Sequence, residues 1–240
     1  MTVLAVKDNF SIEDQVEIGQ TLKEQILAMP DVFPILDRSA YECAYQRIDI
    51  LYNTLKNTSA VENRKTFDWD VHIINDPSKN AFILPGGHLF IYSGLIKYLQ
   101  TESELVAILG HEIAYADQGL AVEVIREEYG DVTISSLCSN NVTDKLPAIA
   151  ESLPDLKYKE RKVLAADAIS ISLICPFQYD ASSLKRVIRK ADQDQIKWIQ
   201  SKGGSLPKRM ENINQLIADC GVDESTFEER YTNYKNKCLK

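Results

Sequence analysis

The sequence predicts an α+β fold, in which a small mixed β-sheet packs against a mostly helical body. Apolar residues recur at helical spacing in both end regions, and a middle region shows strand-like alternation beside a Pro-Gly-Gly turn. The chain has 240 residues, of which 45% are hydrophobic and 26% are charged. Because this composition is enough for one large hydrophobic core, we treat residues 1–240 as a single domain.

Residues 1–65 are expected to contribute two N-terminal helices. The first spans about 11–28, because a capping arrangement at Ser11 precedes a run of helical spacing that ends before two prolines. The second spans about 38–58, where apolar residues recur at intervals of three and four. A polar loop then leads to the middle region.

Residues 66–92 carry the strand signals. The segment 67–74 alternates apolar and polar side chains over most of its length, which is typical of a strand. Two short apolar runs follow, at 81–84 and 88–92, and the tight turn at 85–87 joins them. This pattern predicts a hairpin-like unit and completes the small sheet.

Residues 93–128 are expected to form helices that border a cleft. A short helix is predicted at 93–98, and a capping box at 101–104 begins the helix that carries His111. Residues 129–155 read as irregular, and the C-terminal part, 156–240, reads as helical. The predicted C-terminal helices span about 157–174, 181–190, 192–202, 207–218 and 224–235.

The most informative motif is His111-Glu112-Ile113-Ala114-Tyr115 on the central helix. Zinc peptidases carry His-Glu-x-x-His on a helix, where the two histidines, four residues apart, bind one zinc ion from the same face. The glutamate acts as the general base on the zinc-bound water. Here Tyr115 stands at the position of the second histidine, so the motif is one residue short of that pattern.

The chain resembles the soluble branch of the M48 zinc metallopeptidases over about residues 11–216. The resemblance rests on Asn80-Ala81-Phe82, Pro85-Gly86-Gly87, the run from 102 to 112, Asp167, and the segment with Pro207 and Arg209. It implies a gluzincin-like metalloendopeptidase fold with the His111 helix at a substrate cleft. The residues it implies for that cleft are Asn80, Ala81, Phe82, Pro85, Gly86, Gly87 and His88.

The resemblance also implies a zinc-ligand set that this chain does not retain. His111 matches the first ligand, but Tyr115 replaces the second histidine. The third ligand would be a glutamate four residues before Asp167, and Val163 stands there instead. A late histidine of the family falls near Leu206. Asp167 itself matches the residue that supports the site without binding the metal.

Coordination energetics indicate how much these changes matter. A four-ligand zinc site contributes roughly 10–16 kcal/mol, or about 3–4 kcal/mol per ligand. One imidazole alone would then bind zinc with only about millimolar affinity. Without the ion, the pKa of water stays near about 15.7, and Glu112 becomes a vestigial general base. We therefore expect His111 to be a remnant ligand and no cofactor to be tightly bound.

The altered residues have structural interpretations. His111 is expected to be hydrogen-bonded in the interior, and Glu112 to pair with a neighbour. Tyr115 is expected to fill the vacated space and to bond His111 or Glu112, while Val163 packs as an apolar residue. Asp167 is expected to contact His111 or a backbone amide. These interpretations together describe a metal site that has been filled in.

Three functional hypotheses remain. The first is a catalytically inactive peptidase-like protein that binds a peptide or protein segment along the strand after the Pro-Gly-Gly turn. The second is an active metalloendopeptidase with zinc held by a non-standard ligand set around His111 and Glu112, drawing on Tyr115, Asp117 or His88. The third is a structural subunit whose helical C-terminal half docks on a partner.

Charge and cysteine usage point to a compartment and exclude some partners. The formal net charge is −8 and there is no basic stripe, which argues against nucleic acid and anionic membrane surfaces. The five cysteines have irregular spacing, which predicts free thiols in a reducing compartment. No apolar run approaches the ~20 residues of a membrane span, and the N-terminus lacks a secretion signal. We therefore expect a cytoplasmic protein, and a chain with a trimmed leader would read the same way.

Overall fold

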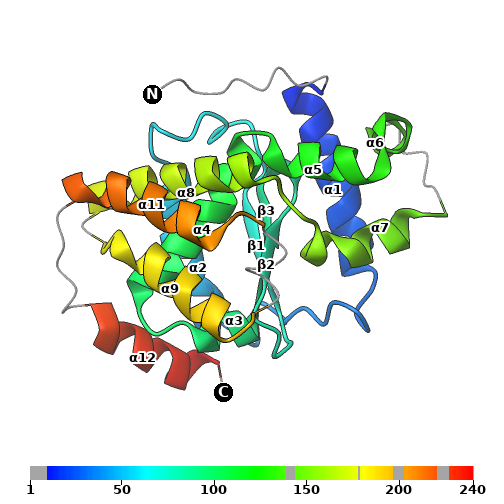
Figure 1. Cartoon of the computed structure of the whole chain (residues 1–240). Helices are drawn as coiled ribbons and strands as arrows, with labels where there is room; N and C mark the ends of the chain where they lie inside the picture. Colours follow the sequence, from blue (N-terminus) through cyan, green and yellow to red (C-terminus); the bar gives the residue numbers. More distant parts are fainter. Residues whose placement is uncertain (1–9, 139–143, 178, 197–202, 221–226, 240) are drawn as a thin grey trace.

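The computed structural model describes residues 10–138, 144–177, 179–196, 203–220 and 227–239. It confirms the predicted fold class, because helices surround a three-stranded mixed sheet (Figure 1). One continuous hydrophobic core links the sheet to the helices on either side of it. The site described below lies inside this core.

Both predicted N-terminal helices are present, as α1 (Ile12–Leu27) and α2 (Glu42–Lys56). The capping box at the start of α1 is complete. The Asp14 backbone N–H donates to the Ser11 hydroxyl at 3.0 Å, and the Ser11 N–H donates to the Asp14 carboxylate at 2.7 Å. This reciprocal pair satisfies donors that a helix leaves without partners at its N-terminus.

The sheet consists of β1 (Asp70–Ile74), β2 (Ala81–Ile83) and β3 (His88–Tyr92), in the order β1-β3-β2. β2 and β3 pair antiparallel, as the predicted hairpin requires, and β1 pairs parallel to β3. The strand β3 after the Pro-Gly-Gly turn is therefore central, with a neighbour on each side. The prediction that this strand pairs with a peptide is wrong, because neither of its edges is open.

The two outer strands differ in how their outer edges are covered. The edge of β1 is partly capped by chain from the N-terminal region, since the Leu36 N–H donates to the Ile73 carbonyl at 2.8 Å. β2 is the remaining edge, and it carries Ala81 and Phe82 of the predicted cleft. Any added strand would therefore join β2.

The tight turn between β2 and β3 is the short 3-10 helix η1 (Pro85–Gly87). Gly86 and Gly87 have φ angles of 78° and 93°, which favour glycine. Helix α1 packs directly on this turn, since a Cβ on Gly19 would lie 1.8 Å from the Pro85 carbonyl oxygen. The Pro-Gly-Gly element is thus a packing junction in this chain.

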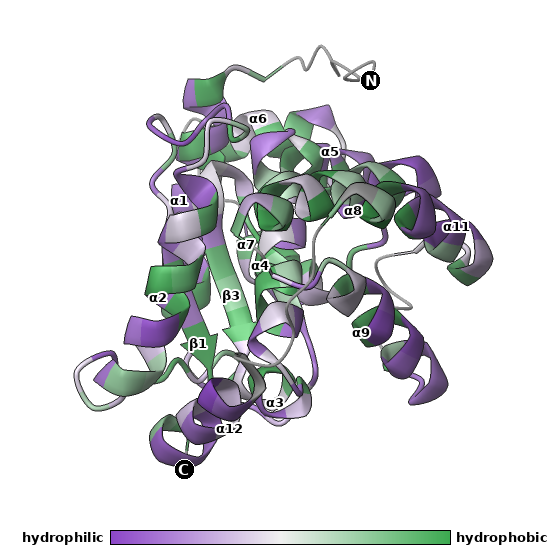
Figure 2. Cartoon of the chain, turned by 90° about the vertical axis from the view of Figure 1, so that its left-hand side faces the viewer, coloured by the Kyte–Doolittle hydropathy of each residue, from purple (hydrophilic) through white to green (hydrophobic). Residues whose placement is uncertain are grey.

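The central helices are α3 (Ser93–Tyr98), α4 (Glu102–Asp117) and α5 (Leu120–Tyr129). Every residue of α4 is buried, and Figure 2 shows α4 and β3 inside the molecule, with hydrophilic faces of α9 and α11 turned outward. The Thr101 hydroxyl caps α4 by accepting from the Glu104 N–H at 3.1 Å. The Glu104 side chain departs from the predicted capping box, because it accepts from the Gln100 N–H at 2.6 Å.

The prediction that residues 129–155 are irregular is wrong. This region contains α6 (Asp131–Cys138), α7 (Leu146–Ser152) and the start of the 3-10 turn η2 (Leu153–Asp155). Both α6 and α7 pack on α1. They are short helices whose stability comes from these tertiary contacts, which a weak local pattern of apolar residues does not reveal.

The C-terminal part is helical, as predicted. Its elements are α8 (Glu160–Ile174), η3 (Cys175–Phe177), α9 (Ser182–Gln193), α11 (Leu206–Leu216), η4 (Ile217–Asp219) and α12 (Phe227–Cys238). The predicted start of the first helix at 157 is wrong, because α8 begins at Glu160 and residues 156–159 are not helical. The predicted helix at 192–202 falls partly on residues 197–202, which lie outside the described residues.

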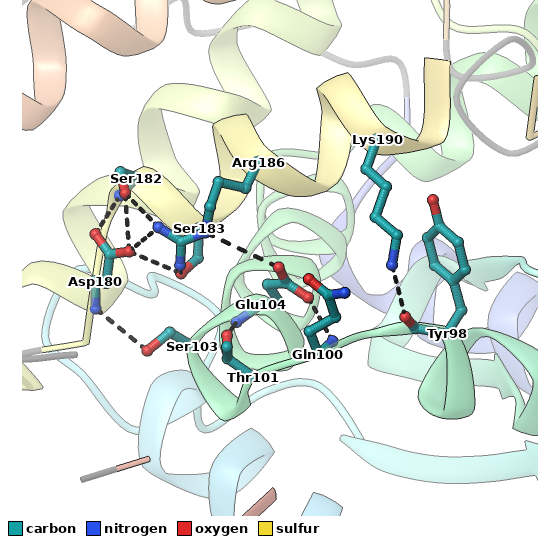
Figure 3. Close-up of polar contacts among 10 residues, drawn as sticks. All are labelled: Tyr98, Gln100, Thr101, Ser103, Glu104, Asp180, Ser182, Ser183, Arg186 and Lys190. Carbon is teal, nitrogen blue, oxygen red and sulfur yellow. Dashed lines mark hydrogen bonds and ion pairs between the residues drawn. The ribbon is translucent and has the colours of Figure 1, made fainter. Parts of the chain in front are cut away.

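A polar network joins the start of α9 to the start of α4 (Figure 3). The Asp180 carboxylate accepts from the Ser182 N–H at 2.9 Å and pairs with Arg186. The Asp180 N–H donates to the Ser103 hydroxyl at 3.3 Å, and Arg186 Nε lies 4.0 Å from the Glu104 carboxylate. These contacts help to fix the first turn of α4 and so the register of the residues further along it.

Four of the five cysteines form disulfides, Cys43–Cys238 and Cys175–Cys220, with Cα atoms 5.3 and 5.4 Å apart. Cys138 is a free thiol. The prediction that the cysteines are free is therefore wrong for these two pairs. Their partners are separated by 195 and 45 residues, so local spacing gives no sign of the pairing.

Candidate functional site

A close crossing of α4 and α8 sets the geometry around His111. A Cβ on Gly110 would lie 3.0 Å from the Ser170 hydroxyl oxygen, so the two helices approach closely at this point. The same hydroxyl donates to the Ala107 carbonyl at 2.8 Å. This crossing places Asp167, one turn before Ser170, opposite His111.

His111 and Asp167 are in direct contact, as the sequence predicted. His111 Nε2 lies 3.1 Å from Asp167 Oδ1, and both side chains have no solvent exposure. His111 Nδ1 lies 3.9 Å from Glu112 Oε1, and Glu112 is also fully buried. The two polar residues of the motif therefore face the protein interior.

Arg209 completes this group, and sequence reasoning missed it. Its guanidinium binds Asp167 through two hydrogen bonds, with Nε 2.8 Å from Oδ2 and Nη2 2.7 Å from Oδ1. Arg209 is only 1% exposed. The sequence placed Arg209 in a late segment of the family resemblance and in a predicted helix, and neither observation reveals a partner 42 residues away.

The charge of Asp167 is stabilised by its neighbours. Burial acts to raise the pKa of this carboxyl, but the Arg209 charge and the His111 hydrogen bond outweigh burial and hold the pKa below its usual range. Burial likewise acts to lower the pKa of Arg209, and the Asp167 charge outweighs it and raises that pKa. The His111–Asp167–Arg209 chain thus contains a buried ion pair.

Tyr115 fills space beside this chain. Its ring meets the His111 ring edge-on, with centroids 4.7 Å apart and an interplanar angle of 87°. On another side it packs against the Tyr158 ring, with centroids 4.1 Å apart. Burial raises the pKa of Tyr115 well above its ordinary value, so the side chain stays a neutral phenol. The packing prediction is confirmed, and the contact with Tyr158 was not foreseen.

Val163, at the position of the third ligand, is fully buried, as predicted for a packing residue. A Cβ on Gly204 would lie 3.6 Å from Val163 Cγ1 and 3.5 Å from Arg209 Cδ. The backbone at Gly204 therefore covers the gap between these two side chains. An isopropyl group and the stem of an arginine therefore lie on the same side of the backbone at Gly204.

The residues around His111 do not fit a zinc ion. Within the described parts of the chain, no group of three histidine, cysteine, aspartate or glutamate side chains has the arrangement needed to hold a metal. The carboxylate oxygen that faces His111 also accepts from Arg209, so a divalent cation there would meet a guanidinium charge. Neutral Tyr115 supplies no substitute anion.

A zinc site rebuilt from His88, His111 and Asp117 does not form. His88 Nδ1 lies 2.8 Å from Asp70 Oδ1 on the neighbouring strand. The Asp117 carboxylate accepts from the Asn63 N–H at 2.8 Å and so holds the loop before β1. Each of these side chains is engaged in a different part of the fold.

The predicted cleft residues are buried rather than exposed to a groove. Asn80 is 8% exposed and His88 is fully buried, and Ala81, Phe82 and the Pro-Gly-Gly turn are buried as well. The side-chain amide of Asn80 donates to the Pro154 carbonyl at 3.0 Å. The 3-10 turn η2, which follows α7, therefore lies against β2. Figure 1 shows where α7 and β2 lie in the fold.

These features are those of a zinc-peptidase scaffold, and comparison with known proteins identifies it: residues 46–216 match peptidase family M48, so the chain belongs to this family. It is 41% identical over 180 residues to the mitochondrial metalloendopeptidase OMA1 of Schizosaccharomyces pombe. That match covers 72% of this chain and 53% of the yeast protein.

Two further relatives match shorter stretches of the chain. The OMA1 protein of Arabidopsis thaliana is 23% identical over 139 residues, covering 56% of this chain and 28% of the plant protein. The beta-barrel assembly-enhancing protease of Yersinia pestis is 30% identical over 113 residues, covering 46% and 23%. The chain thus spans about half the length of the Schizosaccharomyces pombe protein, and less of the plant and bacterial proteins. In the described residues, no helix has the length and apolarity to cross a membrane.

Proposed function

We propose that this protein is a pseudo-peptidase of family M48, which binds an extended peptide or protein segment and does not hydrolyse it. The observation that carries the proposal is the pairing of Asp167 with Arg209 beside His111, where the family's chemistry needs a zinc ion. Tyr115 and Val163, in the other two ligand positions, supply packing instead of donor atoms. Glu112 then has no activated water to deprotonate.

The binding half of the proposal rests on the outer edge of β2. The Leu84 N–H donates to the His88 carbonyl and the Tyr92 N–H donates to the Asn80 carbonyl. Because hydrogen-bonded pairs alternate along an antiparallel ladder, the backbone groups of Ile83 point away from β3. No hydrogen bond between described residues ends on these groups of Ile83, so a strand added to β2 can pair with them once η2, which packs on β2, has moved away.

Zinc affinity tests the hydrolytic half. Competition with a chromophoric chelator should show only millimolar-range binding to the natural chain, as expected of about one imidazole ligand. The variant Tyr115→His/Val163→Glu should bind zinc orders of magnitude more tightly. Tyr115→Phe, which keeps the packing and adds no ligand, serves as the matched control. Tight zinc binding by both the natural chain and Tyr115→Phe would contradict the proposal.

Binding without cleavage tests the other half. Fluorescently labelled β-casein, a natively unfolded chain, should bind and remain intact on prolonged incubation. Ile83→Pro removes the outward N–H from β2 and should weaken this binding, because a proline cannot donate to an added strand. Thermal unfolding of the variant checks that the fold survives. Progressive fragmentation of β-casein, abolished by a chelator, would overturn the proposal.

Active metalloendopeptidase remains the second candidate, favoured by the 41% identity to a protein named a metalloendopeptidase. This candidate requires zinc ligands other than the histidine, cysteine, aspartate and glutamate side chains of the described residues. Zinc-dependent cleavage of β-casein is its expected signature. The two candidates therefore give opposite results in the same assays.

The cysteine pairs bear on the compartment in which the protein works. The expectation of a cytoplasmic protein used free thiols as a premise, and the two cysteine pairs remove that premise. We propose instead a compartment that permits disulfides. Thiol titration of the unfolded, unreduced protein should detect Cys138 alone. Detection of five reactive thiols would contradict this proposal and favour a reducing compartment.

A further inference from the structure

Residues 153–159, here named the strap, lie between β2 and the His111 region. The strap begins in η2, which packs on β2. Its Pro154 carbonyl accepts a hydrogen bond from the side-chain amide of Asn80, the residue directly before β2. Near its other end, Tyr158 lies on Tyr115 with ring centroids 4.1 Å apart. One continuous segment therefore spans from the sheet edge to the altered zinc motif.

Beyond the 3-10 turn η2, the strap is buried as an extended peptide in a groove would be. Leu156 and Tyr158 are each 7% exposed, whereas the residues between and beside them, Asp155, Lys157 and Lys159, are exposed. Alternate burial at a period of two is the pattern of an extended segment with one face against the protein. The strap thus buries an apolar pair at i and i+2, of which Tyr158 lies beside Tyr115, while Lys157 and Lys159 are exposed.

Two features hold the strap in place from outside. A Cβ on Gly203 would lie 2.4 Å from the Tyr158 carbonyl oxygen, so the backbone there presses directly on the strap. Lys159 pairs with Glu127 at 2.8 Å, and Lys162 pairs with Glu123 at the same distance just beyond the strap. The strap is therefore fixed by a steric clamp and by partly exposed ion pairs.

The strap covers β2 without satisfying its outer edge. Ile83 is 3% exposed, yet none of the hydrogen bonds between described residues ends on its outward backbone groups. Buried backbone groups without partners are costly, and a strand added to β2 would supply those partners. An incoming peptide can thus make hydrogen bonds that the strap does not make.

From these contacts we infer that the strap is an internal pseudo-ligand, which must leave before a peptide can pair with β2 and which displays the chemistry of that peptide. This inference rests on the proposed function. The ligand it predicts is an extended segment with a leucine-like and an aromatic side chain two residues apart, with one lysine between them and one after them, as in the strap's own Leu-Pro-Asp-Leu-Lys-Tyr-Lys.

The entry point is the hollow beside the leading end of β2. This surface hollow has a volume of about 500 Å³ and is lined by residues that include Asn80, Tyr92 and Pro154. Its charged lining residues are Glu151, Asp155 and Lys79, so its net charge is negative and suits the lysines of the predicted ligand. A peptide seated there can pair with β2 progressively as the strap withdraws.

Binding of the labelled strap peptide to the full chain tests the inference. The variant Leu156→Ala/Tyr158→Ala truncates the two buried side chains of the strap. Lys157→Ala, which alters an exposed side chain of the same segment, is the matched control. The Leu156→Ala/Tyr158→Ala variant should bind the peptide at least about tenfold more tightly than the natural chain. In the natural chain the strap, as a tethered competitor, acts at about millimolar effective concentration. Lys157→Ala should bind as the natural chain does.

A second variant leaves the strap's own side chains intact and guards against misfolding of the first. Gly203→Ala places a Cβ against the Tyr158 carbonyl and should also strengthen binding of the strap peptide. A peptide with serine in place of its leucines and tyrosine should not bind any of these proteins. Circular dichroism establishes that each variant is folded.

The outcomes separate this inference from the function on which it rests. Equal and tight binding of β-casein to the natural chain and both strap variants would overturn the strap's role and leave the peptide-binding function standing. Stronger β-casein binding without strap-peptide binding would overturn the predicted ligand chemistry. Failure of every folded variant to bind either probe would overturn the peptide-binding function itself.

Discussion

Two histidine–aspartate contacts in this molecule show how environment decides what the same pair of groups does. In the first, Asp167 lies between His111 and Arg209, and none of the three exceeds 1% exposure. In the second, Asp70 lies 2.8 Å from His88 and 3.2 Å from Lys23, and its side chain is 34% exposed. The buried contact is closed to water and substrate, whereas the second reaches the surface.

The difference lies in the counter-ion and its solvation. Arg209 holds Asp167 with two hydrogen bonds in the core, where an unpaired charge is strongly unfavourable. Lys23 makes one contact to a carboxylate that water also reaches, so its charge can be replaced by solvent. The first contact is therefore a structural element of the core, and the second joins a buried histidine to a carboxylate that reaches the surface.

Removing the two counter-ions should separate the two contacts most clearly. Arg209→Met leaves Asp167 charged and buried, and we expect it to lower the free energy of unfolding by about 3–5 kcal/mol. Lys23→Met should lower it by less than about 1 kcal/mol. Urea unfolding at pH 7 measures both, and a similar small loss for the two variants would erase the distinction.

Acid unfolding should separate them next. Burial acts to raise the pKa of Asp70, but its hydrogen bonds with His72 and His88 outweigh burial and hold the pKa below its usual range. The pKa of Asp167 is also lowered, as described above. Each contact therefore stabilises the fold above about pH 4, the unfolded pKa, and this contribution is lost as pH falls toward the folded pKa.

Comparison of Asp167→Asn with Asp70→Asn isolates each contribution. Both variants should show a weaker loss of stability between neutral and acid pH than the natural chain, with the larger change for Asp167→Asn. Urea midpoints measured across a pH series give the slopes. An unchanged slope for Asp167→Asn would mean that Asp167 does not have a lowered pKa in the folded protein.

Replacement of the histidines should give the smallest effects. His111→Gln disturbs a buried hydrogen bond to Asp167 and should cost about 1–2 kcal/mol. His72 stacks on Phe90 with ring centroids 4.8 Å apart and is partly exposed, so His72→Gln should cost about 0.5–1 kcal/mol. A larger loss for His72→Gln would reverse the ranking of the two regions.

The sequence anticipated the features that depend on local pattern. The α+β class, the hairpin around Pro85-Gly86-Gly87 and the helix that begins at Thr101 follow from periodicity and turn chemistry, and the structure contains each of them. A contact of Asp167 with His111 or a backbone amide was also expected, because Asp167 matches the family residue that supports the metal site, and the structure shows the contact with His111.

Features that depend on distant parts of the chain were missed. Arg209 reaches Asp167 across 42 residues, and Tyr158 meets Tyr115 across a similar stretch of chain. The strand order made β3 central, which no property of its own residues reveals. Helix α6 was missed because its stability comes from packing on α1 rather than from a long amphipathic pattern.

The most direct test of the proposal that zinc binding has been lost is the zinc content of the natural chain. The protein would be produced in zinc-supplemented medium, passed through a desalting column without chelator, and measured by elemental analysis against protein concentration. A content far below one zinc per chain is expected, because His111 faces an aspartate already paired with an arginine. A content near one zinc per chain, lost together with β-casein cleavage in His111→Ala, would contradict it.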